Sequence, residues 1–491
     1  MTSMPSHICT SAAFDSLREN SKMPVMNDKL ELRIFAVLFV GFLLAGPVGR
    51  VSASPPQAIA DQYRAAANQL IDAAMGDHFA FERLAELVDT FGPRFSGSQN
   101  LEDALDWILE QMEADGLDNV HAEPVMVPRW VRGNESAELL EPRPRDLPML
   151  GLGGSIGTPA AGITAEVLVV RSFDELAERQ GEAAGKIVLF NVAFTSYGQT
   201  VAYRREGAIA ASRAGAVASL IRSVGPYSQQ TPHTGAMAYE EGVAAIPHAA
   251  ITVEDAQMLQ RFQDRGEPIV VRLKMEAELL PDSPSRNVMA EIRGSEFPDE
   301  VIVLGGHIDS WDVGQGAMDD GGGCVAAWEA VRLMKVLGLR PKRTIRVVLW
   351  TNEENGLRGG NGYHDAHLNE LDDHILAMES DGGVFKPSGF GFTGSDEAYE
   401  IISEIATLLD RIEAGTINRG GGGADIRPLM NEGVPGMGLQ VDGTRYFWYH
   451  HTDSDTIDKL DADEMALCIA AMAVIAYVVA DMPQRLPRVR S

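Results

Sequence analysis

The segment Gly305–Gly323 constrains the fold of this 491-residue chain more than any other. It reads GGHIDSWDVGQGAMDDGGG and follows the apolar run Val301–Leu304, which is typical of a buried β-strand. The imidazole of His307 and the carboxylates of Asp309 and Asp319 are costly to bury unless a cation pairs them. The end of this strand therefore predicts a metal site.

Three later apolar runs also end in polar side chains: Glu353 and Glu354 after Arg343–Trp350, Glu379 and Asp381 after Ile375–Met378, and His450 and His451 after Met437–Val441. Ligands bind outside the carboxyl ends of strands in open α/β sheets. The glycine cluster is followed by a helical pattern over Cys324–Leu337, which completes a strand–turn–helix–strand unit. We therefore predict an α/β fold with a mixed, largely parallel central sheet flanked by helices.

The candidate ligands are histidine nitrogens and carboxylate oxygens, which suit zinc, with manganese or cobalt as substitutes. Five such ligands are too many for one tetrahedral ion that keeps a position open, whereas two ions about 3.5–4 Å apart can share them. The adjacent acids Glu353 and Glu354 indicate divided roles, one binding metal and the other taking a proton from water. Asp309 is placed to hold the His307 imidazole from outside the metal shell. The set predicts metal-assisted hydrolysis of an amide-like bond.

The formal net charge of −29 argues against nucleic acids or anionic membranes as partners. Basic residues precede the apolar run Ile34–Ala45, and a small-residue site ends at Ala53. This pattern predicts a signal peptide over residues 1–53, export to a secreted or periplasmic location, and no membrane span in the mature form. An uncleaved anchor is the alternative. Cys324 and Cys468 are expected to be buried free thiols.

Composition divides the rest of the chain into three parts. Residues 54–141 form the N-terminal part of the domain that also carries the metal candidates, with a helical, amphipathic pattern expected to about Gly133. Residues 142–284 are rich in Ala and Gly, contain short β runs and lack a metal-ligand cluster, so we predict an inserted module. Residues 285–491 carry the metal candidates and form the catalytic domain. The acidic string Asp453–Asp463 is interpreted as a solvated turn with a helix N-cap.

The run from His307 to His451 resembles the co-catalytic dinuclear zinc peptidases, the family that includes secreted bacterial aminopeptidases and glutamate carboxypeptidases. The segments Val88–Asn100, Asp115–His121 and Trp130–Ser136 are also similar to this family. The resemblance implies the zinc-exopeptidase fold. It also implies that residues 142–284 form a β-rich protease-associated (PA) domain over or beside the active-site cleft.

Carried over by motif, the resemblance implies two Zn²⁺ per chain. His307 and Asp381 would bind one ion and Glu354 and His451 the other. Asp319 would bridge the ions and be joined to the next residue by a cis peptide. His451 is preferred to the histidine before it because the family's ligand is followed by Thr. Glu379 remains an alternative to Asp381.

The resemblance also implies that Glu353 is the general base and that His450 stabilises the oxyanion. Asp425, after a glycine-rich stretch, would bind a free substrate α-amine, with a simple surface turn as the alternative. The expected activity is that of an exopeptidase on small unblocked peptides, a dipeptidase or carboxypeptidase that forms a homodimer. The alternatives are an aminopeptidase of the same family, a non-catalytic receptor-like protein on the same scaffold, and a one-zinc acyl-transfer cyclase.

Overall fold

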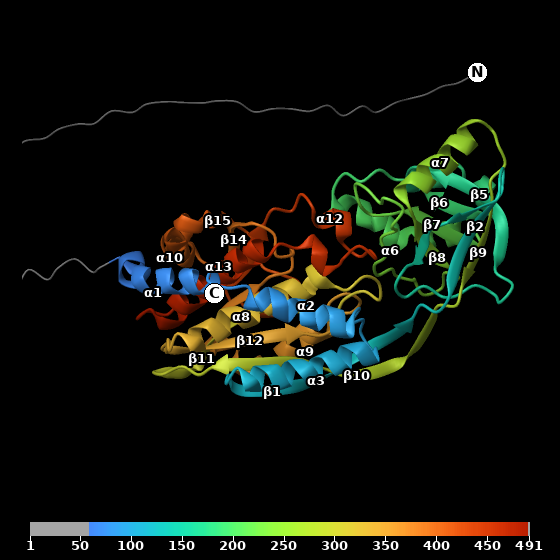
Figure 1. The fold of residues 1–491 in the computed structure, drawn as a ribbon. Helices are drawn as coiled ribbons and strands as arrows, with labels where there is room; N and C mark the ends of the chain where they lie inside the picture. The colour runs from blue at the N-terminus through green and yellow to red at the C-terminus, as the bar shows by residue number, and fades with distance from the viewer. Residues whose placement is uncertain (1–57, 490–491) are drawn as a thin grey trace, which may run out of the picture. The chain divides into compact units, whose positions relative to one another are not determined.

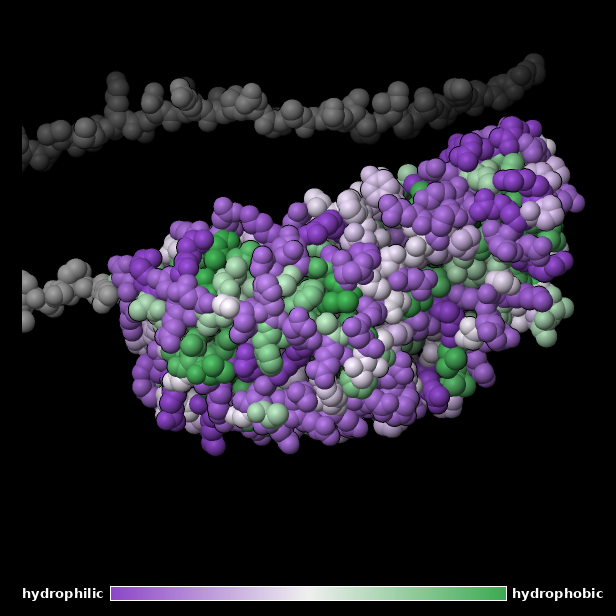
Figure 2. Space-filling view, in the orientation of Figure 1, coloured by the Kyte–Doolittle hydropathy of each residue, from purple (hydrophilic) through white to green (hydrophobic). Residues whose placement is uncertain are grey.

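The strands of residues 58–489, the part of the chain that this computed structural model describes, form two eight-stranded sheets (Figure 1). The signal peptide expected over residues 1–53 lies outside the described residues. Both sheets belong to one compact unit of the chain. The visible face of this unit is mostly hydrophilic, with apolar side chains in small patches (Figure 2).

The first sheet is mixed, as predicted. Its strands, in spatial order, are β1 (Asp118–Val131), β10 (Glu278–Ile292), β12 (Arg343–Trp350), β11 (Phe297–His307), β13 (His374–Glu379), β16 (Gly436–Val441), β14 (Pro387–Thr393) and β15 (Thr416–Arg419). The strands β12, β11, β13 and β16 are parallel neighbours. Their carboxyl ends therefore meet at one edge of the sheet.

Helices cover both faces of this sheet because its central strands are apolar on both sides. In β11, Ile302 and Leu304 face one core cluster, whereas Val301 and Val303 face another that contains Trp350. The first cluster is built with α1 (Ile59–Ala74), α2 (Phe79–Phe91), α3 (Gln99–Ala114), α8 (Gly322–Val336), α10 (Asp396–Ala406) and α13 (Ala462–Asp481). The second is built with α9 (Arg358–Ala366) and α11 (Arg427–Asn431). The other short helices outside the second sheet and its helices are α12 (Tyr446–Tyr449), η1 (Ala317–Gly321), η2 (Leu368–Asp373), η3 (Thr407–Ile412) and η4 (Ile457–Lys459).

The helix α13 is long and apolar enough to cross a membrane by composition, but most of it is buried in the protein. It packs in the first core cluster with α8, and this explains its nearly continuous apolar sequence. Cys324 and Cys468 are both buried and free, which confirms the prediction made for them.

The helical pattern expected to about Gly133 ends earlier, and the prediction is wrong for β1. This strand pairs antiparallel with β10 along the edge of the first sheet. Pro124 and Pro128 are incompatible with a helix interior, and Val125 and Val127 are buried while Met126 between them is exposed. The period of two, rather than the helical period, decides the structure here.

The second sheet is formed within residues 135–275, and we call this part of the chain the second-sheet module. Its strands, in spatial order, are β3 (Arg145–Leu147), β2 (Glu135–Glu141), β9 (Val270–Met275), β5 (Ile163–Val170), β6 (Ile187–Phe190), β7 (Ala218–Arg222), β8 (His248–Ile251) and β4 (Met149–Gly151). The helix α7 (Val253–Asp264) packs on one face, and α4 (Phe173–Glu178), α5 (Gln180–Ala183) and α6 (Tyr197–Arg213) pack on the other. The module begins before the expected boundary at residue 142 because β2 pairs with β9, and it ends before residue 284 because β10 belongs to the first sheet. Its assignment as a PA domain stays a prediction.

Candidate metal centre

Five predicted ligands converge beyond the carboxyl ends of the parallel strands. Nε2 of His307, at the end of β11, lies 3.4 Å from Oδ1 of Asp319 and 3.3 Å from Oδ1 of Asp381. Nε2 of His451, after α12, lies 3.0 Å from Oε2 of Glu354 and 3.4 Å from Oδ2 of Asp319. The carboxylate of Asp319 therefore lies between two groups of ligand atoms, one oxygen facing each.

The donor set fits divalent cations. Oδ2 of Asp319 and Oε1 of Glu354 are buried and have no hydrogen-bond partner among residues 58–489. An unpaired buried carboxylate oxygen is costly unless a cation or proton satisfies it. Ligand atoms of His307, Asp319 and Glu354 lie within 4.8 Å of one another. Histidine nitrogens and carboxylate oxygens in this arrangement are the ligands that zinc prefers.

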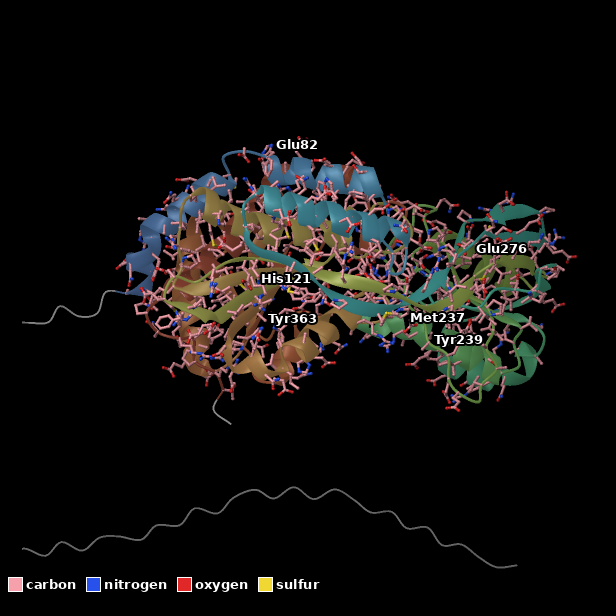
Figure 3. All side chains as sticks on the ribbon, turned by 90° about the horizontal axis from the view of Figure 1, so that it is seen from below. Glu82, His121, Met237, Tyr239, Glu276 and Tyr363 are labelled. Atoms are coloured by element: carbon pink, nitrogen blue, oxygen red, sulfur yellow. The ribbon has the colours of Figure 1, made fainter. Side chains whose placement is uncertain are left out.

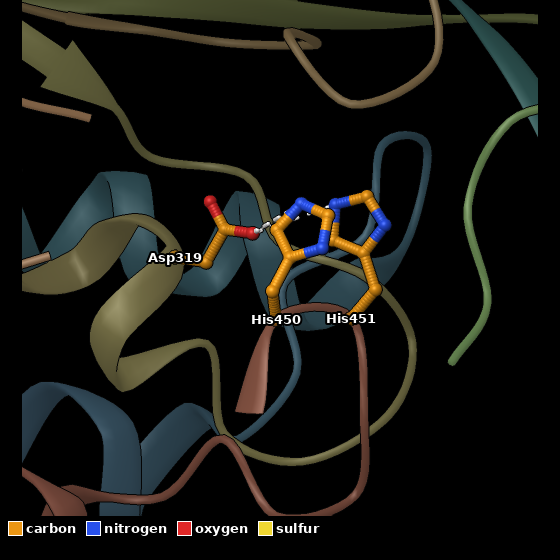
Figure 4. Close-up of side chains that lie close together, drawn as sticks. All are labelled: Asp319, His450 and His451. Carbon is orange, nitrogen blue, oxygen red and sulfur yellow. Dashed lines mark ion pairs between the residues drawn. The ribbon is translucent and has the colours of Figure 1, made fainter. Parts of the chain in front are cut away.

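His450 lies against the same centre. Its ring stacks on that of His451 with 3.5 Å between the centroids, and its Nε2 is 3.7 Å from Oδ2 of Asp319. Figure 4 shows both imidazoles directed at this carboxylate. Burial lowers the pKa of both rings well below the usual value, so both are neutral near pH 7. The geometry brings His450 within reach of the centre, near Oδ2 of Asp319, the oxygen that also faces His451.

Glu353 lies in the cleft beside the ligands. Burial, with the carboxylates of Asp381 and Asp309, raises the pKa of Glu353 to about 8, despite the opposing charge of His307. A carboxyl group with this pKa can take up and release a proton near neutral pH.

Asp309 contacts His307 through its backbone rather than through its carboxylate. Nδ1 of His307 lies 2.9 Å from the carbonyl oxygen of Asp309 and 3.7 Å from Oδ1. The carboxylate instead accepts hydrogen bonds from the backbone N–H groups of Glu353 at 3.0 Å and Glu354 at 3.4 Å. One residue thus orients the imidazole with its main chain and holds the turn of the two glutamates with its side chain.

The position of Asp319 between the two groups of ligand atoms depends on a residue that the sequence did not single out. The peptide between Asp319 and Asp320 is cis, as the resemblance implies. The carboxylate of Asp455 accepts hydrogen bonds from the N–H groups of Met318 at 2.7 Å and Asp319 at 3.2 Å. Asp455 is 3% exposed, so the solvated turn expected here is wrong at this position. Asp461 in the same string does cap α13, as predicted.

Asp425 is not brought into the cleft. Its side chain is 1% exposed, and it is absent from the residues that line the cleft among residues 58–489. Glu379 accepts hydrogen bonds from the backbone N–H groups of Ala424, Asp425 and Ile426, at 2.9–3.0 Å. The carboxylate of Glu379 therefore holds this loop, while that of Asp381 faces His307.

The cleft has a volume of about 470 Å³ and is lined on its other side by the second-sheet module. Arg204 of α6 is 5% exposed, and its Nη1 lies 3.3 Å from Nδ1 of His451. Its other contacts are the carbonyl of Thr234 at 3.4 Å and the hydroxyl of Tyr197 at 2.8 Å. Its Nε has no hydrogen-bond partner among the described residues. Met237, labelled with Tyr239 in Figure 3, lines the same wall.

Sequence reasoning missed Arg204 because the module lacks a cluster of metal ligands. Nothing in its helical stretch distinguishes one arginine as a candidate for the site. Only the folded chain brings it next to His451. A buried guanidinium without a carboxylate partner is unusual, since buried charges are normally paired.

The chain matches known peptidases over most of its length. Residues 287–476 match the model of Peptidase family M28. The chain is 53% identical over 409 residues to carboxypeptidase Q of Bos taurus, with 83% of this chain and 87% of that protein covered. The carboxypeptidase Q of Homo sapiens is 52% identical with the same coverage.

Solved structures agree with this match. A peptidase M28 precursor from Shewanella amazonensis SB2B has a TM-score of 0.83 at 36% identity, with 88% of this chain and 100% of that chain covered. BSAP, a zinc aminopeptidase from Bacillus subtilis, has a TM-score of 0.63 at 21% identity, with 83% of this chain and 96% of that chain covered, and shares the fold.

The mixed sheet, the cluster of ligands at its carboxyl edge and these matches define a metallo-exopeptidase. The chain belongs to peptidase family M28, and within it 53% of the aligned residues are identical to those of the bovine carboxypeptidase Q. The receptor-like alternative is therefore set aside.

Proposed function

We propose that the chain is a secreted, zinc-dependent exopeptidase that hydrolyses small unblocked peptides, with dipeptides as its main substrates. One observation carries this proposal: a cluster of candidate metal ligands lines the same cleft as the buried guanidinium of Arg204, which has no carboxylate partner among the described residues. The relatives are a carboxypeptidase Q and a zinc aminopeptidase, and this is consistent with a zinc enzyme that cleaves peptides at a chain end.

The proposed metal centre holds two Zn²⁺. His307 and Asp381 would bind one ion, Glu354 and His451 the other, and Asp319 both. The two oxygens of Asp319 face the two groups, and this supports a bridging role. Bound zinc would lower the pKa of water and polarise the scissile carbonyl.

Glu353 is the proposed general base. Its carboxylate would accept the proton of the attacking water and deliver it to the leaving amine. The pKa of about 8 and the position in the cleft support this assignment. The neutral ring of His450, beside Asp319, would donate a hydrogen bond to the developing oxyanion.

Arg204 is the proposed site for the substrate carboxylate. A guanidinium can bind a carboxylate with two parallel hydrogen bonds, and among residues 58–489 the hydrogen-bond partners of this one are neutral groups. A substrate with a free carboxylate close to the scissile bond would pair it. This favours a dipeptidase or carboxypeptidase over an aminopeptidase. Asp425 has no substrate role in this proposal because it is buried outside the cleft.

Two further parts of the proposal rest on the sequence. The apolar leader with its small-residue site supports export of the mature enzyme. The family resemblance supports a homodimer, which the mass of the mature protein in solution would test.

A substrate panel tests the proposed function. Zinc-loaded and chelator-treated enzyme would be assayed on free dipeptides, N-acetylated dipeptides, dipeptide amides and aminoacyl-anilides. We expect zinc-dependent cleavage of free dipeptides, at least ~10-fold better than of the matching amides because only the free acid pairs Arg204. A preference for aminoacyl-anilides would identify an aminopeptidase instead. Folded, zinc-loaded enzyme that cleaves nothing in the panel would overturn the proposal.

A further inference from the structure

A buried serine outside the catalytic part of the chain lies in the hydrogen-bond network of the two glutamates. Ser96, between α2 and α3, is 1% exposed. Its hydroxyl donates to Oδ2 of Asp309 at 3.1 Å and accepts from Nδ2 of Asn352 at 2.9 Å. Ser96 thus joins two side chains that come from the ends of β11 and β12.

Both partners of Ser96 hold the backbone of the Glu353–Glu354 turn. The carboxylate of Asp309 accepts the N–H groups of both glutamates. Asn352 directly precedes the turn, has a φ of +63°, and accepts the N–H of Arg358 at 3.3 Å through its Oδ1. A residue with positive φ is held there by its surroundings, so these side-chain bonds decide which way the turn faces.

The segment that carries Ser96 is locked onto the metal-binding loop. Arg94 is fully buried and donates to the carbonyl oxygens of Ile308 at 2.9 Å, Gln315 at 2.8 Å and Gly316 at 2.8 Å. These three residues lie between His307 and Asp319. Arg94 therefore fixes the main chain around the ligands and sets the place of the Ser96 hydroxyl two residues later.

We propose that Ser96 is a positioning residue that orients Glu353 and Glu354 through Asp309 and Asn352. The inference rests on the proposed function, because it assigns these glutamates to proton transfer and to zinc. Without the hydroxyl, Oδ2 of Asp309 keeps only the 3.4 Å bond from the Glu354 N–H, and Asn352 loses its bond to the N-terminal segment. The turn would then sample orientations in which the two carboxylates no longer face the cleft.

The test compares Ser96→Ala with Ser98→Ala, a matched change in the same segment. Ser98 caps α3 by accepting the N–H of Leu101 at 3.2 Å and does not contact the metal-centre residues. For Ser96→Ala we expect kcat on a free dipeptide at saturating zinc to fall about 10–100-fold, and zinc affinity by chelator competition to fall about 10-fold. KM should change less than about 3-fold, because substrate contacts stay. Ser98→Ala should lower the unfolding midpoint while leaving kcat and zinc affinity unchanged.

A double-variant cycle with Asn352→Gly gives a second readout that a purely structural role would not produce. Glycine tolerates the positive φ, so this change removes the amide without straining the turn. If Ser96 acts through Asn352, the losses in kcat are not multiplicative in the double variant. Unchanged kcat and zinc affinity in Ser96→Ala, or fully multiplicative losses, would overturn the inference. Wild-type enzyme inactive on the whole panel would instead refute the proposed function, and zinc affinity alone would still test the positioning role.

Discussion

The two sheets of this protein share a parallel core but not a function. Each contains four neighbouring parallel strands: β12, β11, β13 and β16 in the first sheet, and β5, β6, β7 and β8 in the second. The described residues outside the module carry the first sheet, and we call them the first-sheet part. Among the described residues, the clusters able to hold a metal ion all belong to this part. Parallel topology therefore supplies a place for a site, and the residues that follow the strands decide whether one forms.

Two hydroxyl side chains at strand ends of the second sheet are satisfied within the module. Thr252, after β8, accepts the N–H of Asp255 at 3.0 Å and so caps α7. Ser223, after β7, donates to the carbonyl of Ile251 at 2.8 Å and accepts the N–H of His233 at 3.0 Å. These hydroxyls both donate and accept within the module, Thr252 donating to Oδ2 of Asp255 at 2.9 Å, and they need no cation, in contrast to the carboxylates at the ends of β12 and β13.

The second-sheet module nevertheless contributes to the cleft from a helix. Arg204 projects from α6 toward His451. The comparison thus separates two proposed tasks, metal binding in the first-sheet part and recognition of a substrate carboxylate in the module.

The largest effect is expected from Glu353→Gln, which removes the proposed base from the first-sheet part. The amide cannot take a proton, so kcat on a free dipeptide should fall about 10³-fold with zinc content unchanged. The control is Glu182→Gln, an exposed acid of the module, paired with Arg179. Activity of Glu353→Gln within tenfold of wild type would remove this residue from the mechanism.

The next effect tests whether the module takes part in recognition. Arg204→Met keeps most of the apolar stem of the side chain and removes its charge. We expect KM for free dipeptides to rise about 100-fold, since loss of one partner of a buried charge pair costs about 2–5 kcal/mol, while dipeptide amides are little affected. Arg213→Met, at the end of the same helix, serves as control, because its exposed guanidinium pairs with Glu240 and does not line the cleft. Equal losses on acids and amides would mean that Arg204 only supports the fold.

A third prediction compares the pH dependence of stability in the two parts. Burial lowers the pKa of His248 in the module and of His374 in the first-sheet part to about 4. Each neutral ring stabilises the fold fully above its ordinary pKa of about 6.5, and this stability is lost as the pH falls toward 4. Between pH 7.5 and 5 the loss is about 2 kcal/mol per ring, at about 1.4 kcal/mol per pKa unit.

Urea unfolding of His248→Gln and His374→Gln at both pH values would measure this difference. Each variant should be less stable than wild type at pH 7.5 but lose less stability on acidification. If the free energy of unfolding of either variant fell between pH 7.5 and 5 by as much as that of wild type, the histidine in that part would not contribute to the pH dependence.

The smallest effect concerns local rules that both parts obey. Ser172 caps α4 in the module by accepting the N–H of Glu175 at 3.0 Å, and Ser395 caps α10 in the first-sheet part by accepting the N–H of Ala398 at 3.1 Å. Replacement of either by Ala should lower the free energy of unfolding by about 1 kcal/mol, and the double variant should show the sum. Clearly unequal values from urea titrations would indicate that tertiary contacts, rather than the cap, dominate at one of the two sites.

Much of the metal centre could be predicted from local patterns. His307, Glu354 and Asp381 each follow an apolar run, and the structure brings them together because the runs become parallel neighbours in one sheet. Periodicity failed at β1, where two prolines and an alternating pattern outweigh the helical pattern of the preceding residues. A ligand that follows a strand is thus easier to predict than the exact end of a helical region.

The order of strands and helices, the ligand types and the turn chemistry are local properties, so they can be read along the chain from spacing and side-chain chemistry. The roles of Ser96, Arg204 and Asp455 are different, because each depends on partners more than 100 residues away in the sequence. The sequence around a serine, an arginine or an aspartate contains no pattern that predicts such a distant partner. Packing of the N-terminal segment, the module and the C-terminal turn around one cleft assigns these three side chains their neighbours. Burial then makes each hydrogen bond and charge there worth more than it is in water.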